Sequence, residues 1–387
     1  MIIGSATPEG TKKYAQDHPA IAYHSLGGLD LAVSPVGFGC YRVAAGSEEQ
    51  REALAQALLS GVNMIDTSAN YTDGQSEELV GLVLNELIGQ GKIARDQVVV
   101  ISKAGYLQGQ NYLLSQERKS AGKEFSDLVI YGEGLEHCIH PDFLADQLER
   151  SLKRLNLSCL DCYLLHNPEY YLTWAKQHRV GRREARGEYL QRFRQAFTHL
   201  EAEVAAGRIS SYGVSSNTFV RPQSHYEFTC LQELWELAQD ISPQHHFRVV
   251  QFPLNLMEPG GVLQKNQPCG LSVLDYAREQ GLGVLTNRTL NAIKEGKLVR
   301  LSEQAYKGQA SEEAKRYKAK VEKVTEDWLG TDNLSQLAVR VLRSTAGIST
   351  ALVGMRRMSY VQDVVLELER DCLQKERQKN WQRLRGC

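Results

Sequence analysis

The chain has 387 residues, of which 42% are hydrophobic and 24% charged, with 45 Lys and Arg against 46 Asp and Glu. This composition excludes a disordered or fibrous protein, and the balanced charge gives no overall field that would attract nucleic acid or anionic lipid. No stretch approaches the roughly 18 consecutive apolar residues of a membrane span. The polar first residues and the eight scattered cysteines resemble neither a signal peptide nor a disulfide framework. We therefore expect a cytoplasmic, reduced protein that binds neither nucleic acid nor membrane.

The predicted elements begin after a polar N-terminal arm, residues 1–20. Two short apolar runs, 21–26 and 29–33, flank Gly27-Gly28 and predict a hairpin. From there, short apolar runs alternate with longer amphipathic stretches, a pattern that is typical of a parallel sheet with covering helices. The runs expected to form strands are 36–39, 62–66, 98–103, 160–166, 209–215, 248–252, 283–286 and 349–354.

Eight such units predict a closed (β/α)8 barrel, or TIM barrel, over residues 21–370, with the hairpin across its N-terminal end. Three segments, 105–140, 167–188 and 289–329, are longer than ordinary loops, and the last includes an expected helix at about 311–329. Loops above about 12–15 residues are usually functional or disordered. Because all three follow strands, we expect them at the C-terminal face, where active sites of such barrels lie. Residues 371–387 predict a mixed-charge helical tail at the surface.

Groups that transfer protons stand at the ends of three successive predicted strands. Asp66 ends the second strand and Tyr71 lies just beyond it, while Lys103 and His166 end the third and fourth. Each residue alone has an ordinary structural interpretation, but a barrel would bring all four to one mouth. A lysine within reach favours a phenolate and makes a tyrosine a better proton donor, and an imidazole can orient a carbonyl oxygen or relay the proton. Such a site would reduce a carbonyl only with an outside hydride donor.

The four residues belong to a longer series of short motifs along the chain. The first is Gly61-x-Asn63-x-Ile65-Asp66-Thr67-Ser68-x-x-Tyr71, followed by Gly74-x-Ser76-Glu77-x-x-x-Gly81. The others are Ile101-Ser102-Lys103, Asp161-x-Tyr163-Leu164-Leu165-His166, Tyr212-Gly213-Val214-Ser215-Ser216-Asn217, Val249-Val250-Gln251-Phe252-Pro253-Leu254-Asn255 and Ala351-Leu352-Val353-Gly354-Met355-Arg356-Arg357. From about residue 22 to 368 this ordered set resembles the aldo-keto reductases. That family folds as a (β/α)8 barrel and reduces carbonyls with NADPH and without metal.

The resemblance implies a role for each matching residue. Tyr71 would be the general acid, tuned by Asp66 and Lys103, and His166 would orient the carbonyl. The residues implied to contact the cofactor, besides Asp66, are Gly39, Cys40 and Tyr41 after the first strand, Ser215, Ser216, Asn217 and Gln251 at the nicotinamide, Gly354, Arg356 and Arg357 at the adenosine phosphate, and Asp363 at the adenine. Two guanidinium groups suit a 2′-phosphate, which favours NADPH.

Two positions depart from the family pattern. Asn287 stands after the seventh strand, where the family commonly has an aromatic residue to stack on the nicotinamide, and Arg288 beside it could cover the ring or reach the pyrophosphate. Val364 follows Asp363 where the family often has Asn, so the adenine contacts are expected to differ.

Other sequence features give less evidence about function. The sequence lacks the glycine-rich motifs of Rossmann folds and P-loops. Cys159-x-x-Cys162 is half a zinc or redox motif and is better explained as structural cysteine. His245-His246 is expected at the surface, and the arginines at 179, 182, 183 and 186 are expected on a solvated face, with contact to an acidic substrate or partner as the other possibility.

Three hypotheses follow for the activity. The leading one is an NADPH-dependent enzyme that reduces an aldehyde or small ketone, with no metal, acting as a monomer or a homo-oligomer. The second is an NADP(H)-binding redox-sensing or regulatory subunit with low turnover. The third makes Lys103 the Schiff-base nucleophile of an aldolase, which would leave Ser215, Gln251 and Arg356 without a role.

Overall fold

The computed structural model describes residues 1–294, 296–302 and 309–385. Eight parallel strands form its centre: β3 (Val36–Gly39), β4 (Met64–Asp66), β5 (Val99–Ala104), β9 (Cys162–His166), β10 (Tyr212–Ser215), β11 (Phe247–Pro253), β12 (Gly283–Asn287) and β15 (Thr350–Val353). They close into a barrel in the order β10-β11-β12-β15-β3-β4-β5-β9. The predicted (β/α)8 barrel is therefore confirmed, and each strand falls within or beside its predicted apolar run.

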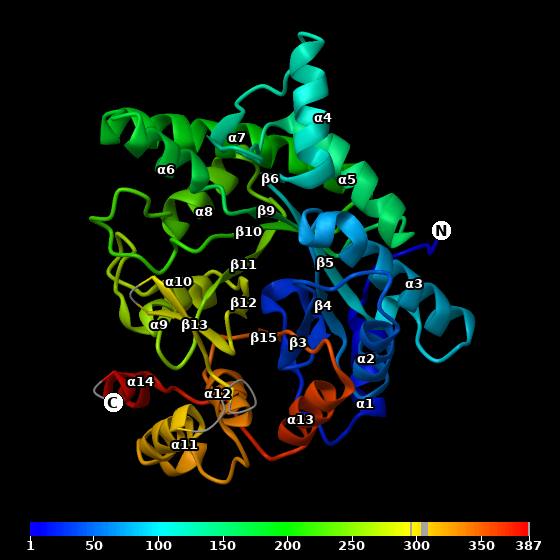
Figure 1. Ribbon diagram of the computed structural model, residues 1–387, viewed down its shortest axis with the longest axis vertical. Coiled ribbons are helices and arrows are strands. Elements are labelled where there is room, and N and C mark those ends of the chain that lie inside the picture. Colours follow the sequence, from blue (N-terminus) through cyan, green and yellow to red (C-terminus); the bar gives the residue numbers. More distant parts are fainter. Residues whose placement is uncertain (295, 303–308, 386–387) are drawn as a thin grey trace.

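One helix of each unit packs outside the barrel (Figure 1). These helices are α2 (Glu48–Leu59), α3 (Gln75–Gly89), α5 (Pro141–Leu155), α7 (Arg182–Ala205), α8 (Leu231–Ile241), α10 (Val273–Glu279), α12 (Leu334–Arg343) and α13 (Met358–Leu368). Helix α5 shows how the sequence builds them. Pro141 occupies its first turn, Phe143, Leu144 and Leu148 are buried on one face, and Asn156 ends it in the left-handed conformation.

The N-terminal end of the barrel is closed by the predicted hairpin. Strands β1 (His24–Ser25) and β2 (Ala32–Val33) pair antiparallel, with a 3-10 turn, η1 (Gly27–Leu29), between them. Leu26, Leu31 and Val33 are buried in one apolar cluster with side chains of the barrel strands. Because this end is filled by side chains, the opposite mouth is the end that remains available for a ligand.

The first residues are more ordered than the expected arm. Helix α1 (Pro8–Asp17) begins at Thr7, whose hydroxyl accepts a hydrogen bond from the Gly10 amide, a standard N-cap. Tyr14 is buried and donates its hydroxyl to the Leu58 carbonyl of α2. Tyr14 is the only large buried side chain of this helix, so the sequence has no hydrophobic periodicity from which a helix could be expected.

The three long segments after strands carry their own structure. The first holds α4 (Gly109–Ser120), which projects at the top of Figure 1, and a small sheet of β6 (Tyr106–Leu107), β8 (Leu135–His137) and β7 (Val129–Gly132). The second holds α6 (Tyr170–Gln177). The third holds the hairpin β13 (Asn291–Lys294) and β14 (Lys297–Arg300), then α11 (Gln309–Glu322) and η5 (Glu326–Trp328). Residues 295 and 303–308 of the last segment lie outside the described part of the chain.

The remaining elements are short or terminal. They are η2 (Tyr71–Gly74), η3 (Arg95–Gln97), α9 (Gly260–Leu263) and α14 (Gln378–Leu384). Helix α14 corrects the expected surface tail, because Trp381 is fully buried and donates its indole N–H to the Thr345 hydroxyl at 3.0 Å. The tail therefore packs on the barrel; its last two residues lie outside the described part. None of the described helices has both the length and the apolar character needed to cross a membrane.

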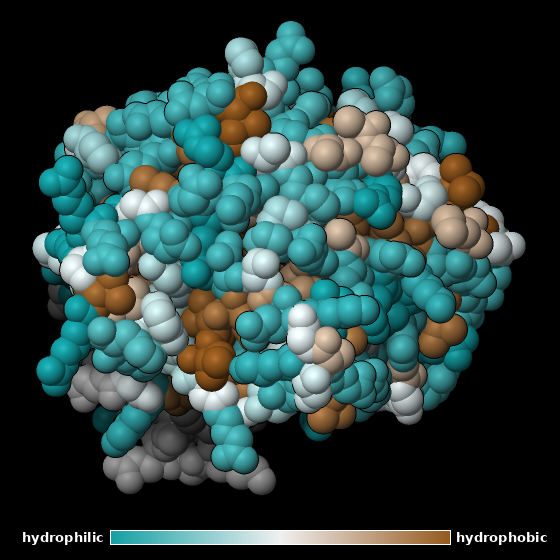
Figure 2. Space-filling model, turned by 90° about the horizontal axis from the view of Figure 1, so that it is seen from above, coloured by the Kyte–Doolittle hydropathy of each residue, from teal (hydrophilic) through white to brown (hydrophobic). Residues whose placement is uncertain are grey.

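Hydrophilic side chains dominate the face of the molecule that Figure 2 shows. On the face in Figure 2, hydrophobic residues lie in small separate groups among them. His245, expected at the surface, is instead buried, with its ring 4.7 Å from that of Trp235 on α8. The tryptophan covers the imidazole, a contact that the sequence pattern did not indicate.

Candidate active site

A cavity of about 730 Å³ opens at the C-terminal mouth of the barrel, a size within the usual range of cofactor and ligand pockets. Most of the residues singled out in the sequence line it: Gly39, Tyr41, Asp66, Tyr71, His166, Ser215, Asn217, Gln251, Asn287, Arg288, Gly354, Arg356 and Asp363. The strand register explains this convergence. Gly39 pairs with Asp66 across β3 and β4, and Ser215 lies between His166 and Gln251 on β9, β10 and β11.

Lys103 lies behind the cavity wall and joins two of its groups. Its ammonium is fully buried and donates to Asp66 Oδ2 at 2.7 Å, to the Thr67 carbonyl at 2.8 Å and to the Tyr71 hydroxyl at 3.3 Å. The Lys103 Nζ atom also lies 4.8 Å from the centre of the Tyr71 ring. The phenol that faces the cavity is thus in direct contact with a buried cation, and that cation is held by a carboxylate.

These contacts fix the protonation states of the group. Burial alone would lower the pKa of Lys103, but the Asp66 carboxylate and Tyr71 raise it above its ordinary value, so the amine stays charged. Burial raises the pKa of Tyr71, and the positive charge of Lys103 offsets only part of that effect. Lys103 thus lowers this pKa, as expected, but the loss of hydration has the larger effect and the pKa stays above its ordinary value. Tyr71 is a neutral, protonated phenol at physiological pH.

His166 completes the group on the neighbouring strand. Its ring centre lies 5.8 Å from that of Tyr71, and burial together with the charge of Lys103 places its pKa well below the ordinary value. The imidazole is therefore neutral. Its Nδ1 is 3.1 Å from the Ser68 hydroxyl, which leaves Nε2 to serve a bound molecule.

Two neighbours of His166 were not identified from the sequence. Ser68 belongs to the sequence motif that ends at Tyr71, yet only the fold brings its hydroxyl to the imidazole. Tyr106 of β6 lies edge-on to the His166 ring at 4.8 Å, from a segment whose structure had no readable pattern. Gly105 makes this approach possible, since a Cβ there would lie 2.4 Å from the His166 carbonyl oxygen.

A chain of hydrogen bonds crosses the floor of the cavity. Ser215 donates to Gln251 Oε1 at 2.9 Å, and Gln251 Nε2 donates to Asp66 Oδ1 at 2.8 Å. Ser216, expected beside them, faces away from the cavity and bonds Thr218 and Thr229. Of the three consecutive residues expected at the nicotinamide, Ser215 and Asn217 line the cavity and Ser216 does not.

Asn287 and Arg288 occupy the position where an aromatic ring was expected. Asn287 Nδ2 lies 3.4 Å from Gln251 Oε1, and its Oδ1 is buried with no partner among the described residues. Arg288 has a positive φ of 59° and donates to Asn217 Oδ1 at 3.0 Å and to Glu258 at 3.1 Å. The arginine thus ties together the loops beyond β10, β11 and β12.

The far end of the cavity carries one of the two expected arginines. Arg356 lines it, whereas Arg357 is mostly exposed and lies 3.9 Å from Glu49. Asp363 lines the same end and accepts from Asn333 at 2.6 Å and from Gln336 at 2.9 Å. Cys40 is fully buried outside the lining. The structure therefore brings neither the Arg357 nor the Cys40 side chain to the cavity.

The sequence profile of the aldo/keto reductase family matches residues 35–385, nearly the whole chain. The chain belongs to the aldo/keto reductase family. Solved members of the family share its fold. One from Klebsiella pneumoniae, in complex with NADP and acetate, is 17% identical with a TM-score of 0.54 over 92% of both chains. One from Bacillus halodurans, in its holo form, is 19% identical with a TM-score of 0.56 over 94% of this chain and 96% of that one.

Among curated proteins, this aldo/keto reductase is similar to the NADH-specific methylglyoxal reductase of Escherichia coli. The two are 27% identical over 149 residues, which is 36% of this chain and 40% of the relative. A second methylglyoxal reductase of Escherichia coli is 24% identical over 211 residues, 54% of this chain and 51% of the relative. The matched stretches thus span about half or less of these relatives.

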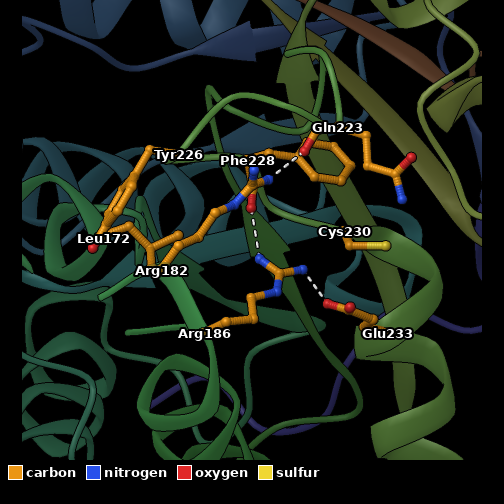
Figure 3. Close-up of a pocket in the computed structure, with 8 residues that line it drawn as sticks. All are labelled: Leu172, Arg182, Arg186, Gln223, Tyr226, Phe228, Cys230 and Glu233. Carbon is orange, nitrogen blue, oxygen red and sulfur yellow. Dashed lines mark hydrogen bonds and ion pairs between the residues drawn. The ribbon is translucent and has the colours of Figure 1, made fainter. Parts of the chain in front are cut away.

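A second, smaller cavity of about 190 Å³ is lined by residues of α6, α7, α8 and the loop before α8 (Figure 3). Arg186 is ion-paired with Glu233 and donates to the Phe228 carbonyl at 2.7 Å, while Arg182 donates to the Gln223 carbonyl at 2.6 Å. Two of the four clustered arginines therefore hold the loop before α8 against α7. These structural contacts were not expected, since the sequence predicted that the arginines lie on a solvated face. Among the described residues, no group of three or more His, Cys, Asp or Glu side chains is placed to hold a metal ion.

Proposed function

We propose that this aldo/keto reductase is an NADPH-dependent oxidoreductase that reduces an aldehyde or ketone carbonyl to an alcohol, reversibly. The observation that carries the proposal is the contact of Lys103 Nζ with both Asp66 and the Tyr71 hydroxyl beside a cavity of cofactor size. A bound nicotinamide cofactor would supply the hydride to the carbonyl carbon, and the remaining tasks fall to the side chains.

Tyr71 holds the proton that the carbonyl oxygen needs. Its raised pKa keeps the phenol protonated until substrate arrives. As negative charge develops on the substrate oxygen, the proton moves from Tyr71 to that oxygen, and the Lys103 ammonium stabilises the phenolate left behind. Asp66 keeps the ammonium charged and in place. The neutral His166 offers Nε2 to orient the carbonyl oxygen.

The lining of the cavity supports a nicotinamide cofactor. Asn287 Oδ1 is a buried acceptor without a partner among the described residues, so a donor such as a carboxamide N–H would satisfy it. Ser215, Asn217 and Gln251 add side-chain donors and acceptors on the same side. We assign Arg288 to the cofactor loop, where its bonds to Asn217 and Glu258 fix three strand ends.

We further propose a preference for NADPH, which rests on Arg356 near the adenosine end of the cavity. A guanidinium pairs well with the oxygens of a 2′-phosphate. The names of the similar proteins mention both nicotinamide cofactors. A structural neighbour is in complex with NADP, and a curated relative is an NADH-specific methylglyoxal reductase.

The test is an activity screen that follows the oxidation of NADPH and of NADH at 340 nm. The purified protein is offered a panel of aldehydes, small ketones, 2-oxoaldehydes and aldoses. We expect catalytic turnover of at least one class with NADPH. Tight NADPH binding with only slow turnover of every class would favour the low-turnover regulatory subunit, and the absence of both binding and turnover would contradict the proposal.

A further inference from the structure

Glu169 is a buried carboxylate that the proposed chemistry does not use. It lies three residues after His166, at the start of α6, and only 4% of it is exposed. Its Oε1 accepts a hydrogen bond from the backbone amide of Asn217 at 2.8 Å. Its Oε2 is buried without a partner among the described residues. Burial of a carboxylate costs free energy unless a charged partner or hydrogen bonds offset the loss of hydration.

No cation among the described side chains contacts Glu169 to balance its charge. The titratable groups that face it are Tyr106 of β6, Tyr170 of α6, Tyr189 of α7 and Glu227 in the loop before α8. Burial raises the pKa of the three tyrosines, so they stay neutral between pH 6 and 8, and Glu227 is paired with Lys176 at 3.2 Å. Burial raises the pKa of Glu169 to about 7.

The residue that Glu169 holds is part of the cofactor cavity. Asn217 lines the cavity, donates its Nδ2 to Asn167 Oδ1 at 3.2 Å and accepts from Arg288 at 3.0 Å. Arg288 in turn binds Glu258. The Glu169 carboxyl therefore fixes the backbone of Asn217. The side chain of Asn217, in turn, connects the loop beyond β10 with the loops beyond β9 and β12.

We propose that Glu169 is a positioning residue for the cofactor, and that its ionised form holds Asn217 more firmly and so strengthens cofactor binding. A carboxylate is a stronger acceptor for the Asn217 amide than a protonated carboxyl group, because charge-assisted hydrogen bonds are roughly twice as strong as neutral ones. Above neutral pH the Asn217 loop is anchored by the charged acceptor, and below it by a neutral one. The inference rests on the proposed nicotinamide cofactor.

The experiment measures the dissociation constant of NADPH at several pH values from 6 to 8, for the wild-type protein and for Glu169→Gln. Glutamine keeps an acceptor oxygen but cannot ionise. The 2′-phosphate of NADPH also titrates near pH ~6, so the quantity of interest is the wild-type constant divided by the Glu169→Gln constant at each pH. We expect this ratio to fall by about threefold to fivefold from pH 6 to 8, with a midpoint near 7.

Glu227→Gln is the matched control, because it removes a neighbouring carboxylate that does not contact Asn217. In that variant the affinity for NADPH should still rise with pH by the wild-type factor, but with a midpoint at lower pH, because the charge of Glu227 helps to raise the pKa of Glu169. A second measurement needs no variant: the amide resonance of Asn217 in the wild-type protein should shift with a midpoint near pH 7.

Each outcome decides between the claims. A constant ratio together with an Asn217 amide that does not titrate would overturn the role of Glu169 and leave the proposed function standing. Failure of the wild-type protein to bind NADPH or NADH at any pH would overturn the proposed function, and this inference with it. If Glu169→Gln does not fold, the Asn217 titration alone decides.

Discussion

The two ends of the barrel each contain a buried ion pair, and the pairs differ in what surrounds them. Near the closed end, Arg95 donates to Asp161 at 2.8 Å, and both Asp161 oxygens also accept backbone amides, from Ala6 and Val100. At the open mouth, Lys103 donates to Asp66 at 2.7 Å, and its third bond goes to the Tyr71 hydroxyl. Both pairs are nearly inaccessible to solvent.

The two ion pairs are chemically similar but contact different groups, and these contacts determine the role of each pair. Among the described residues, Arg95 and Asp161 bind, besides each other, only backbone groups, those of Val98 and Val100 at β5, Cys159 before β9 and Ala6 in the N-terminal segment. The pair therefore joins elements of the fold. The Lys103–Asp66 pair touches a side chain that lines the cavity, so a change in charge at Tyr71 is felt by the ammonium. A buried pair has a chemical role here only where one of its bonds reaches a ligand cavity.

Of the two ion-pair variants, Lys103→Met should have the larger effect on the reaction, because it removes the cation that stabilises a Tyr71 phenolate. Positioned acid–base groups contribute roughly 10²–10⁴-fold in rate, and we expect a loss in that range for carbonyl reduction. Single-turnover oxidation of bound NADPH measures it. Unfolding in urea should also show a loss of stability, because Asp66 is left buried without its cation. A wild-type single-turnover rate in this variant would contradict the chemical role assigned to the Lys103–Asp66 pair.

Arg95→Met should leave the chemistry unchanged and reduce stability alone. Removing one partner of a buried pair costs about 3–5 kcal/mol, and here Asp161 would keep only its two backbone amides. The free energy of unfolding from urea titration checks the loss, and the single-turnover rate of the folded variant should match the wild type. A fall in that rate comparable to that of Lys103→Met would mean that the closed end also contributes to chemistry.

Arg356→Ala should have the smallest effect and act on affinity only. Loss of a charged hydrogen bond to the 2′-phosphate corresponds to roughly tenfold weaker NADPH binding, while the NADH dissociation constant should hardly change. Arg357→Ala is the matched control, since its exposed side chain lies outside the cavity lining and should shift neither constant. Equal weakening of both cofactors by Arg356→Ala would contradict the assigned phosphate contact.

The barrel was predictable because its signal is periodic and long. Eight apolar runs, each followed by an amphipathic stretch, specify the strands, and a closed barrel then brings their ends together. Asp66, Lys103 and His166 could be grouped by this argument alone. Helix α1 was not expected, and the tail was expected to be helical but exposed. Both are anchored by single buried rings, Tyr14 and Trp381, which leave little trace in a polar sequence.

Contacts that depend on loop conformation could not be read in advance. The hydroxyl of Ser216 turns toward Thr229 and away from the cavity, whereas Asn217 lines the cavity as expected. The bonds of Ser68 to His166 and of Glu169 to Asn217 join segments that are far apart in the sequence. Hydrophobic periodicity carries no information about such polar contacts.

The most direct test of the account is the single-turnover rate of Tyr71→Phe with bound NADPH and a good carbonyl substrate. The substitution removes one oxygen and keeps the ring, so the fold and the NADPH dissociation constant should remain those of the wild type. Loss of the proton donor should slow the reaction by at least about 10²–10⁴-fold. A wild-type single-turnover rate in a variant that binds NADPH normally would show that Tyr71 does not donate the proton, and would contradict the mechanism at its centre.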